Sequence, residues 1–288
     1  MDKPTSVIIL TRDKLECTRA CLPGLLNTLH TSWELVVVDN GSTDGTRRWL
    51  NEFRDRCREA GAGITIVLNE PGTGCSTARN IGAGRADGEY LAFIDNDITL
   101  RSRSWLRKLA GAIEEDADTA AAGPKLVYPF EPYPIQCAGA AVSPSGRVQF
   151  RGRGEGRESP EYRAKTEVQC LISACMMVER KAFSAAGGFD EAFNPVEYED
   201  IDLCYRMRSR GRRIVYLPSV EMYHVESVTT AGTPSLGNRR LIIKHGLLFK
   251  ERWHHMFAAE NGPPDAETKW RDVPGAGSLP AGRLPLLP

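Results

Sequence analysis

The sequence predicts an α/β fold in which a largely parallel sheet is covered by helices on both faces. Strand-like and helix-like segments alternate through the first 100 residues, which is the order that produces parallel strands joined by helical crossovers. The strand-like runs, such as residues 34–38, are continuous and rich in β-branched side chains, as strands buried on both faces must be.

The predicted elements of the first half follow from apolar periodicity and from turn residues. Pro23 should kink or restart the first helix, because proline lacks the backbone N–H that a helix interior needs. In chain order the elements are a strand at 6–10, a helix from about 15, a strand at 34–38, a helix at 45–60, a buried strand at 64–68, a helix from 76 and a strand at 90–94.

The second half is less regular, with Pro, Gly and Arg frequent in residues 123–165. Its predicted elements are strand-like pieces at 168–178 and 213–217 and helices at 199–210 and 236–257. We expect one domain over residues 1–235, with halves of about 1–125 and 126–235 and the specificity loops at 128–165. A C-terminal helical extension follows at 236–258, and the Pro- and Gly-rich residues 259–288 should form a disordered tail.

Composition excludes several classes of protein. The 288 residues contain 37 Lys and Arg against 37 Asp and Glu, and 41% are hydrophobic. A disordered chain needs lower hydrophobicity or a large net charge. Nucleic-acid binding usually relies on a basic excess, so we expect no nucleic-acid partner.

The cellular compartment is predicted from targeting signals and from the spacing of the cysteines. The apolar run at residues 7–10 is too short for a signal peptide, and no stretch approaches a membrane-spanning length. The eight cysteines are scattered and form no C-x-x-C pair or zinc framework, so we interpret them as reduced thiols. The prediction is a cytoplasmic protein.

The sharpest chemical signal is the acidic pair in Asp95-Asn96-Asp97, which follows a buried strand. Side chains two residues apart on an extended segment point the same way. Two carboxylates so close repel each other unless a cation compensates them. Mg²⁺ or Mn²⁺, which prefer oxygen ligands, would do so. The alternative is a solvated Asp-Asn-Asp turn.

Two further polar segments follow strands. Asp39 ends the strand at 34–38, and Ser42 or Thr43 can cap the next helix. Ligands of open α/β sheets bind beyond the carboxyl ends of strands, although ordinary capping also explains this turn. Residues 72–77 mimic a dinucleotide fingerprint but lack its third glycine, so NAD binding is rejected. The helix opened there carries Arg79, which is either a site cation or half of a surface salt bridge.

Four acids lie within residues 197–202, at a predicted helix start. Favourable interaction with the helix dipole, at about 0.3–1 kcal/mol each, explains one or two of them. A carboxylate held there by the dipole and crowded by its neighbours suits a general base. His224 stands in a predicted polar loop. A lone histidine is usually structural, and it becomes a candidate ligand because the predicted metal lacks one.

These motifs, taken in order, resemble those of a family 2 glycosyltransferase of the GT-A fold, of the rhamnosyltransferase-like branch. The resemblance runs from about residue 6 to residue 227. No Q-x-x-R-W motif is present, which argues against a processive polysaccharide synthase. The motifs that carry the resemblance are Val38-Asp39-Asn-Gly-Ser-Thr-Asp-Gly-Thr46, Ala78-Arg79-Asn80-x-Gly82, Asp95-Asn-Asp97, Gly187-Gly-Phe-Asp190-Glu191, Glu199-Asp200-x-Asp202-Leu203 and His224-x-x-Ser227.

The resemblance implies a GT-A nucleotide-sugar fold, which is a Rossmann-like mixed sheet, and it implies residue roles. Asp95 and Asp97 would form the D-x-D element at the metal, with His224 as a further metal ligand. Asp200, or less favourably Glu199, would be the general base. The residues implied for nucleotide-sugar binding are Thr11, Arg12, Asp39, Asn40, Ser42, Arg79, Asp95, Asn96, Gly188 and Asp190.

The implied activity is metal-dependent, inverting transfer of a sugar from a nucleotide-diphosphate donor, UDP or dTDP favoured, with Mn²⁺ or Mg²⁺ as cofactor. The acceptor is a glycan, a lipid-linked molecule, a peptide or a small molecule. The basic amphipathic helix at 236–257 either packs on the sheet or makes a peripheral contact with the inner face of a membrane. The alternatives are a sugar-phosphate nucleotidyltransferase, disfavoured because no glycine-rich loop follows the first strand, and a non-catalytic sugar-nucleotide-binding protein.

Overall fold

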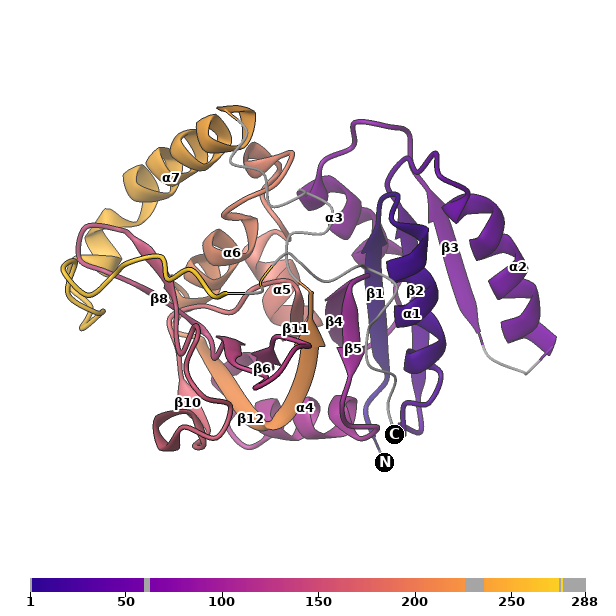
Figure 1. Ribbon diagram of the computed structural model, residues 1–288, viewed down its shortest axis with the longest axis horizontal. Coiled ribbons are helices and arrows are strands. Elements are labelled where there is room, and N and C mark those ends of the chain that lie inside the picture. The colour runs from indigo at the N-terminus through magenta and orange to yellow at the C-terminus, as the bar shows by residue number, and fades with distance from the viewer. Residues whose placement is uncertain (1, 60–62, 226–235, 275, 277–288) are drawn as a thin grey trace.

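A ten-stranded mixed sheet with helices on both faces organises the computed structural model, which describes residues 2–59, 63–225, 236–274 and 276 (Figure 1). The α/β fold class predicted from the sequence is confirmed. The strands are β1 Thr5–Thr11, β2 Trp33–Asp39, β3 Ile64–Leu68, β4 Tyr90–Asp95, β5 Ile98–Leu100, β6 Thr119–Val127, β7 Ile135–Cys137, β8 Ala140–Val142, β9 Val148–Phe150, β10 Thr166–Glu167, β11 Cys175–Glu179 and β12 Arg213–His224.

The helices alternate with the strands in the first half and gather toward the C-terminus in the second. Two short 3-10 turns, η1 Pro160–Tyr162 and η2 Glu191–Phe193, lie in the second half. The α-helices are α1 Leu15–Leu25, α2 Thr46–Glu59, α3 Cys75–Arg85, α4 Trp105–Glu114, α5 Arg180–Ala186, α6 Glu199–Arg208 and α7 Leu236–Phe257.

The sheet order is β10-β12-β6-β11-β4-β1-β2-β3, with β5 paired to β12 and β7 paired to β6. Strands β1 to β4 are parallel, β11 is antiparallel to both β4 and β6, and β12 is parallel to β6. The carboxyl ends of β1, β2 and β4 therefore meet at one edge of the sheet. The chain moves from β1 to β2 and β3 on one side and then crosses back to β4 on the other side of β1. Ligands of open α/β sheets bind at the carboxyl edge of such a switch point.

Alternate residues of the central strands pack into two separate hydrophobic cores, one on each face of the sheet. Val7 and Ile9 of β1 pack on the side covered by α1, α2 and α4, whereas Ile8 packs on the side of α3, α5 and α6. All three side chains are at most 1% exposed. This burial on both faces explains why these strands are continuous apolar runs rather than alternating ones.

Several sequence-based boundaries were wrong. Pro23 does not restart the first helix, which includes it in its last turn and ends at Leu25. Strand β3 is an edge strand with Leu68 48% exposed, not a buried one. Strand β12 continues past residue 217 to His224, because β6 pairs with it on one side and β5 on the other. His224 therefore ends a strand and does not lie in a polar loop.

The segment from residue 259, expected to be disordered, packs on the domain as far as the structure describes it. Ser145 Oγ donates to Asp265 Oδ1 at 2.7 Å. The Trp270 ring contacts the Phe150 ring with centroids 5.3 Å apart, and the guanidinium of Arg153 lies 3.9 Å from the Trp270 centroid. Residues 275 and 277–288 lie outside the described residues. The eight cysteines are all free, as predicted, and seven of them are buried.

The inner side of α7 is fixed to α6 through the fully buried Asp202. Trp253 Nε1 donates to Asp202 Oδ1 at 2.9 Å, and Arg206 Nε donates to Oδ2 at 2.6 Å. Arg252 Nη1 lies 3.3 Å from Oδ1. One carboxylate thus satisfies three donors at the junction of the two helices.

Replacing Asp202 by alanine is expected to lower the free energy of unfolding by about 3–5 kcal/mol, because the substitution leaves the cation of Arg206 uncompensated in a buried place. Urea denaturation measures this loss. The matched control is Asp55→Ala, where the side chain is 61% exposed and forms a surface ion pair with Arg54, and it should change stability by less than about 0.5 kcal/mol. Equal effects of the two variants would contradict this account of the junction.

Candidate active site

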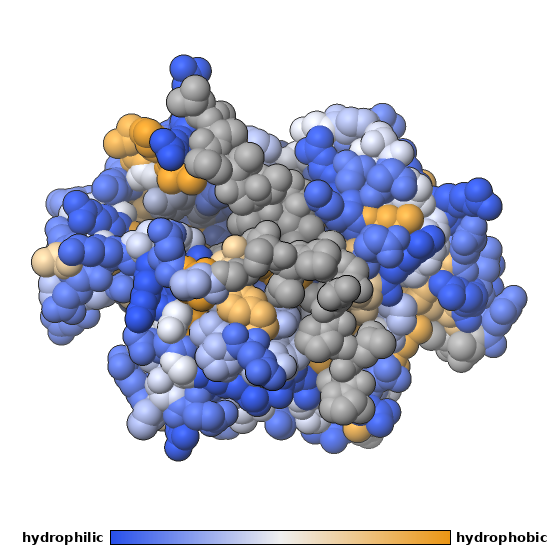
Figure 2. Space-filling model, in the orientation of Figure 1, coloured by the Kyte–Doolittle hydropathy of each residue, from blue (hydrophilic) through white to orange (hydrophobic). Residues whose placement is uncertain are grey.

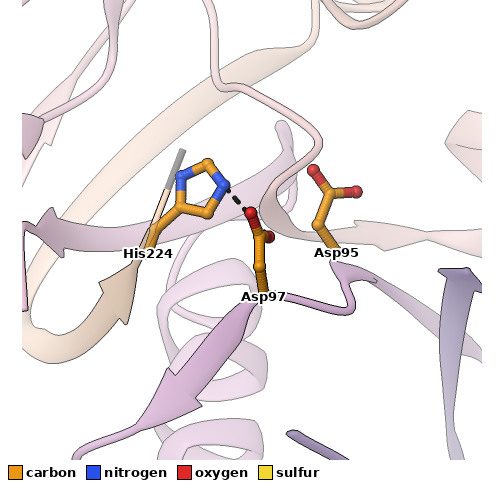
Figure 3. Close-up of side chains that lie close together, drawn as sticks. All are labelled: Asp95, Asp97 and His224. Carbon is orange, nitrogen blue, oxygen red and sulfur yellow. Dashed lines mark ion pairs between the residues drawn. The ribbon is translucent and has the colours of Figure 1, made fainter. Parts of the chain in front are cut away.

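Two carboxylates and an imidazole converge beyond the carboxyl end of β4. Asp95 is the last residue of β4, and Asp97 lies in the turn that leads to β5. The pairing of β5 with β12 sets His224 opposite Ile98, next to Asp97. His224 Nε2 lies 3.2 Å from Asp97 Oδ1, and ligand atoms of all three residues lie within 4.8 Å of one another (Figure 3).

These side chains fit a divalent cation. Asp97 is 5% exposed, and its Oδ1 accepts no hydrogen bond within the part of the chain that the structure describes. Burial raises the pKa of Asp95, the charge of Asp97 raises it further, and Arg79 opposes both. A cation between the carboxylates would remove their repulsion, and oxygen ligands with one imidazole suit Mn²⁺ or Mg²⁺.

Gln136 of β7 orients the imidazole. It is fully buried, its Oε1 lies 2.6 Å from His224 Nδ1, and its Nε2 donates to the His224 carbonyl at 3.5 Å. Since the amide nitrogen faces that carbonyl, the amide oxygen accepts a proton from Nδ1. With Nδ1 carrying that proton, a neutral imidazole would direct its Nε2 lone pair toward Asp97, as a metal ligand must.

Arg79 of α3 connects the acidic turn to the start of α6. Its Nη2 donates to Asp95 Oδ1 at 3.0 Å and its Nη1 to Glu199 Oε1 at 2.8 Å. The guanidinium also lies 5.6 Å from the centroid of the Phe189 ring. Arg79 is only 5% exposed, so the alternative of a surface salt bridge was wrong.

The four acids at residues 197–202 have separate environments. Glu199 is 4% exposed and bonded to Arg79; burial, and then the charge of Asp200, raise its pKa to about 7. Asp200 is partly exposed, and Ser173 donates to its Oδ2 from both its backbone N–H (2.9 Å) and its Oγ (3.3 Å). Asp202 holds α7. Glu197 is also partly exposed, but its carboxylate accepts no hydrogen bond from a described residue. Of the four acids, Asp200 alone combines fixed orientation with access to solvent.

A strained turn precedes these acids. Glu197 and Tyr198 have positive φ values of 86° and 72°, which cost non-glycine residues about 1–3 kcal/mol each. Contacts with α7 hold the turn: the Tyr198 ring packs on Phe249, and His245 Nδ1 lies 2.9 Å from the Val196 carbonyl. The strain is therefore maintained beside the E-D pair by the packing of α7.

Asp39 lies at the end of β2 with one carboxylate oxygen occupied. Its Oδ2 accepts from Arg47 Nε at 2.7 Å and from the Ser42 backbone N–H at 3.1 Å. Its Oδ1 is buried and accepts no hydrogen bond from any described residue. In the same turn, Asn40 Nδ2 donates to the Thr73 carbonyl. Asp39 thus keeps one buried acceptor atom without a partner among the described residues, beside side chains that are fixed by hydrogen bonds.

Other residues of the predicted nucleotide site brace the edge of the sheet. Asn96 Nδ2 donates to both Thr11 Oγ1 and Thr18 Oγ1 at 3.0 Å. Ser42 Oγ accepts the Asp13 backbone N–H at 2.7 Å. These side chains are thus engaged in hydrogen bonds within the protein, whereas Arg12 is exposed.

The loop between α5 and η2 is shaped by close backbone contacts. Gly188 has φ +72°, and a Cβ there would lie 2.7 Å from Asn80 Oδ1. Asn80 bonds both the N–H and the carbonyl of Phe189, at 2.9 and 2.8 Å. Asp190 accepts from the Ala192 N–H at 2.8 Å and from Arg252 of α7 at 2.5 Å. Asp190 therefore ties this loop to α7.

Sequence reasoning missed Arg47, Gln136, Ser173 and Arg252. Gln136 lies 88 residues before His224 in the chain, and Ser173 lies 27 before Asp200, so no local pattern signals either contact. The predicted motif position Ser227 lies outside the described residues.

Two solved structures show a similar fold. The structure described as GalNAc-T7 with UDP, GalNAc and Mn²⁺ has a TM-score of 0.65 and 18% identity, covering 77% of this chain and 44% of that one. The mannosyltransferase PcManGT from Pyrobaculum calidifontis, in complex with GDP-Man and Mn²⁺, has a TM-score of 0.58 and 17% identity, covering 91% and 66%. At such identities the likeness establishes the fold, which is GT-A.

Curated relatives extend far beyond this chain. The uncharacterized protein y4gI of Sinorhizobium fredii is 28% identical over 88% of the chain, which spans 28% of that protein's length. The O-antigen biosynthesis protein RfbC of Myxococcus xanthus is 28% identical over 78% of the chain, which spans 17% of its length.

A family match in the sequence itself accompanies the GT-A fold. The model of the family described as Glycosyl transferase family 2 matches residues 6–186, more than half of the chain, and the chain belongs to this family. This membership removes the alternative of a sugar-phosphate nucleotidyltransferase.

Proposed function

We propose that the chain catalyses metal-dependent, inverting transfer of a sugar from UDP or dTDP to an acceptor nucleophile. The observation that carries the proposal is the cluster of Asp95, Asp97 and His224 joined through Arg79 to the E-D pair. Asp95, Asp97 and His224 would hold Mn²⁺ or Mg²⁺, which when bound neutralises the departing diphosphate. The relatives with bound Mn²⁺ support this cofactor.

Asp200 is proposed as the general base. Its partly exposed carboxylate is fixed by Ser173 and accepts the proton of the acceptor nucleophile as that group attacks the anomeric carbon. Attack opposite the diphosphate inverts the configuration. Glu199 instead positions Arg79, because its Oε1 is already bonded to the guanidinium.

The preference for a pyrimidine nucleotide is supported by the single acceptor at Asp39. Uracil and thymine each present one imide N–H, which Asp39 Oδ1 would accept. Guanine presents two adjacent donors, and the second oxygen of Asp39 is occupied by Arg47 and Ser42. A buried donor left without an acceptor costs about 1–3 kcal/mol.

The proposal is tested by incubating the chain with UDP-, dTDP- and GDP-linked sugars, with and without Mn²⁺. NMR of the product or of the released sugar reports turnover and anomeric configuration. Metal-dependent turnover of a pyrimidine donor with inversion is the expected result. Retention of configuration, or preferential use of a GDP-linked sugar, would contradict the corresponding part of the proposal. Metal-independent UDP binding without turnover would indicate a non-catalytic sugar-nucleotide-binding protein.

Gln136→Leu is expected to weaken Mn²⁺ binding by about 10–100-fold, the usual effect of removing the group that orients a ligating imidazole. Mn²⁺ electron paramagnetic resonance measures the free ion directly. Gln136→Glu is the matched variant, because its carboxylate still accepts the Nδ1 proton and should retain most of the affinity. If both variants bind Mn²⁺ as the wild type does, Gln136 has no part in positioning His224.

A further inference from the structure

The outer side of α7 exposes apolar side chains. Seven large hydrophobic residues in the described part of the chain are exposed, and three of them lie in one stretch of this helix, residues 242–247. Ile242 is 40% exposed, Ile243 62% and Leu247 63%. Ile243 and Leu247 are four residues apart and so share one face. Figure 2 shows hydrophobic atoms, in orange, gathered at the upper left where α7 lies in Figure 1.

Cations border this apolar pair. Arg239, Arg240 and Lys244 are all exposed, and each lies three or four positions from Ile243 or Leu247 along the helix. No ion pair connects these three cations with another residue among those described. We call Arg239, Arg240, Ile243, Lys244 and Leu247 the outer face of α7.

The opposite side of the helix already has its packing partners. Phe249 is fully buried against Tyr198 and Tyr205, and Trp253 is bonded to Asp202. The helix is therefore held in place without its outer face. Ile243 and Leu247 are not buried in the described fold, so core packing does not explain why these two positions are apolar.

We propose that the outer face of α7 binds an anionic lipid bilayer. Apolar side chains flanked by Arg and Lys are the arrangement with which a helix lies in the membrane interface, its apolar groups among acyl chains and its cations among anionic headgroups. A stable protein partner would need about 800 Å² of buried surface on each side, contributed by about 20–30 residues rather than the five of this face. No helix of the described residues is long and apolar enough to cross a membrane.

Membrane binding would orient the candidate active site. The inner side of α7 contacts residues 196–198, immediately before the E-D pair. Binding of α7 to the membrane would therefore hold the E-D pair near the lipid surface, where a lipid-linked acceptor is presented. That consequence rests on the proposed function, whereas membrane binding does not.

Cosedimentation of the whole chain with vesicles tests the proposal without measuring transfer. The vesicles are phosphatidylcholine alone and phosphatidylcholine mixed with phosphatidylglycerol. Two variants are compared with the wild type: Ile243→Gln/Leu247→Gln, and Arg239→Gln/Arg240→Gln/Lys244→Gln. The matched control carries Leu68→Gln and Arg48→Gln, which replace an exposed leucine and an exposed arginine on β3 and α2. Far-UV circular dichroism verifies folding.

The wild type and the control should bind the anionic vesicles and not the neutral ones, and salt should weaken this binding. Removing the cations should weaken it about fivefold per residue, and removing the apolar pair at least about tenfold. Absence of binding by the wild type, or equal binding by all folded variants, would overturn the proposal. Self-association that depends on Ile243 and Leu247, without vesicle binding, would also overturn it in favour of a protein interface.

Discussion

Asp97→Asn is expected to lower kcat about 10²- to 10³-fold and to remove the response of the rate to Mn²⁺. The variant keeps the shape of the side chain but removes one of the two negative charges that face the proposed metal. A metal acting as a Lewis acid contributes several kcal/mol to transition-state stabilisation, and each 1.4 kcal/mol or so changes the rate tenfold. The buried Oδ1 of Asp97 accepts no hydrogen bond from a described residue and lies 3.2 Å from His224 Nε2, so a cation shared with His224 would be its partner.

The control for this experiment is Asp87→Asn, an exposed aspartate at the amino-terminal end of β4. It should retain wild-type turnover and Mn²⁺ dependence. Turnover of Asp97→Asn at the wild-type rate, with the same Mn²⁺ dependence, would rule out Asp97 as a metal ligand.

Asp200→Asn is expected to reduce kcat about 10²- to 10⁴-fold, the range attributed to general acid–base catalysis. Donor KM and Mn²⁺ affinity should hold near their wild-type values, because Asp200 contacts neither Arg79 nor the metal cluster in the described structure. Steady-state kinetics with the donor that the chain uses, together with Mn²⁺ titration, separates these quantities.

Glu199→Gln distinguishes the two members of the E-D pair. Loss of its charge weakens the bond to Arg79, which also holds Asp95, so the expected effect is a higher donor KM. If Glu199→Gln instead lowers kcat more than Asp200→Asn does, with intact Mn²⁺ binding, Glu199 is the base and the assignment of Asp200 is wrong.

Local sequence patterns were sufficient to predict the elements that have a distinctive apolar run or residue spacing. The β-branched run of β2 and the apolar run of β4 identified buried strands, and the spacing of Asp95 and Asp97 predicted that the two carboxylates would lie together. Helix α4 also carries a local signal, since Trp105, Leu106 and Leu109 form an amphipathic stripe, although the elements predicted above do not include it.

Features that depend on pairing between distant segments could not be predicted. Strand β12 reaches His224 because β5 and β6 flank it, and nothing in residues 218–224 alone requires a strand that contains Pro218. The partner of Asp39, Arg47, belongs to the following helix, and the partner of His224, Gln136, belongs to a three-residue strand. Such contacts exist only once the sheet has formed.

The acids at residues 197–202 show a second limit of prediction from sequence. They form one cluster in the sequence, yet side chains on a helix turn by 100° per residue, so Glu199, Asp200 and Asp202 point to different neighbours. One binds Arg79, one is accessible to solvent and one holds α7. Proximity in the sequence therefore predicted the place of the site and not the division of roles.

The central claim is that Asp95, Asp97 and His224 form a metal site that binds the diphosphate of the donor. Calorimetric titration of UDP into the chain, with Mn²⁺ and with EDTA, tests it most directly. The wild type should bind UDP at least about tenfold more tightly with Mn²⁺, and Asp97→Asn should lose that difference while remaining folded. Equally tight binding of UDP in EDTA, or an unchanged Mn²⁺ effect in Asp97→Asn, would contradict the claim.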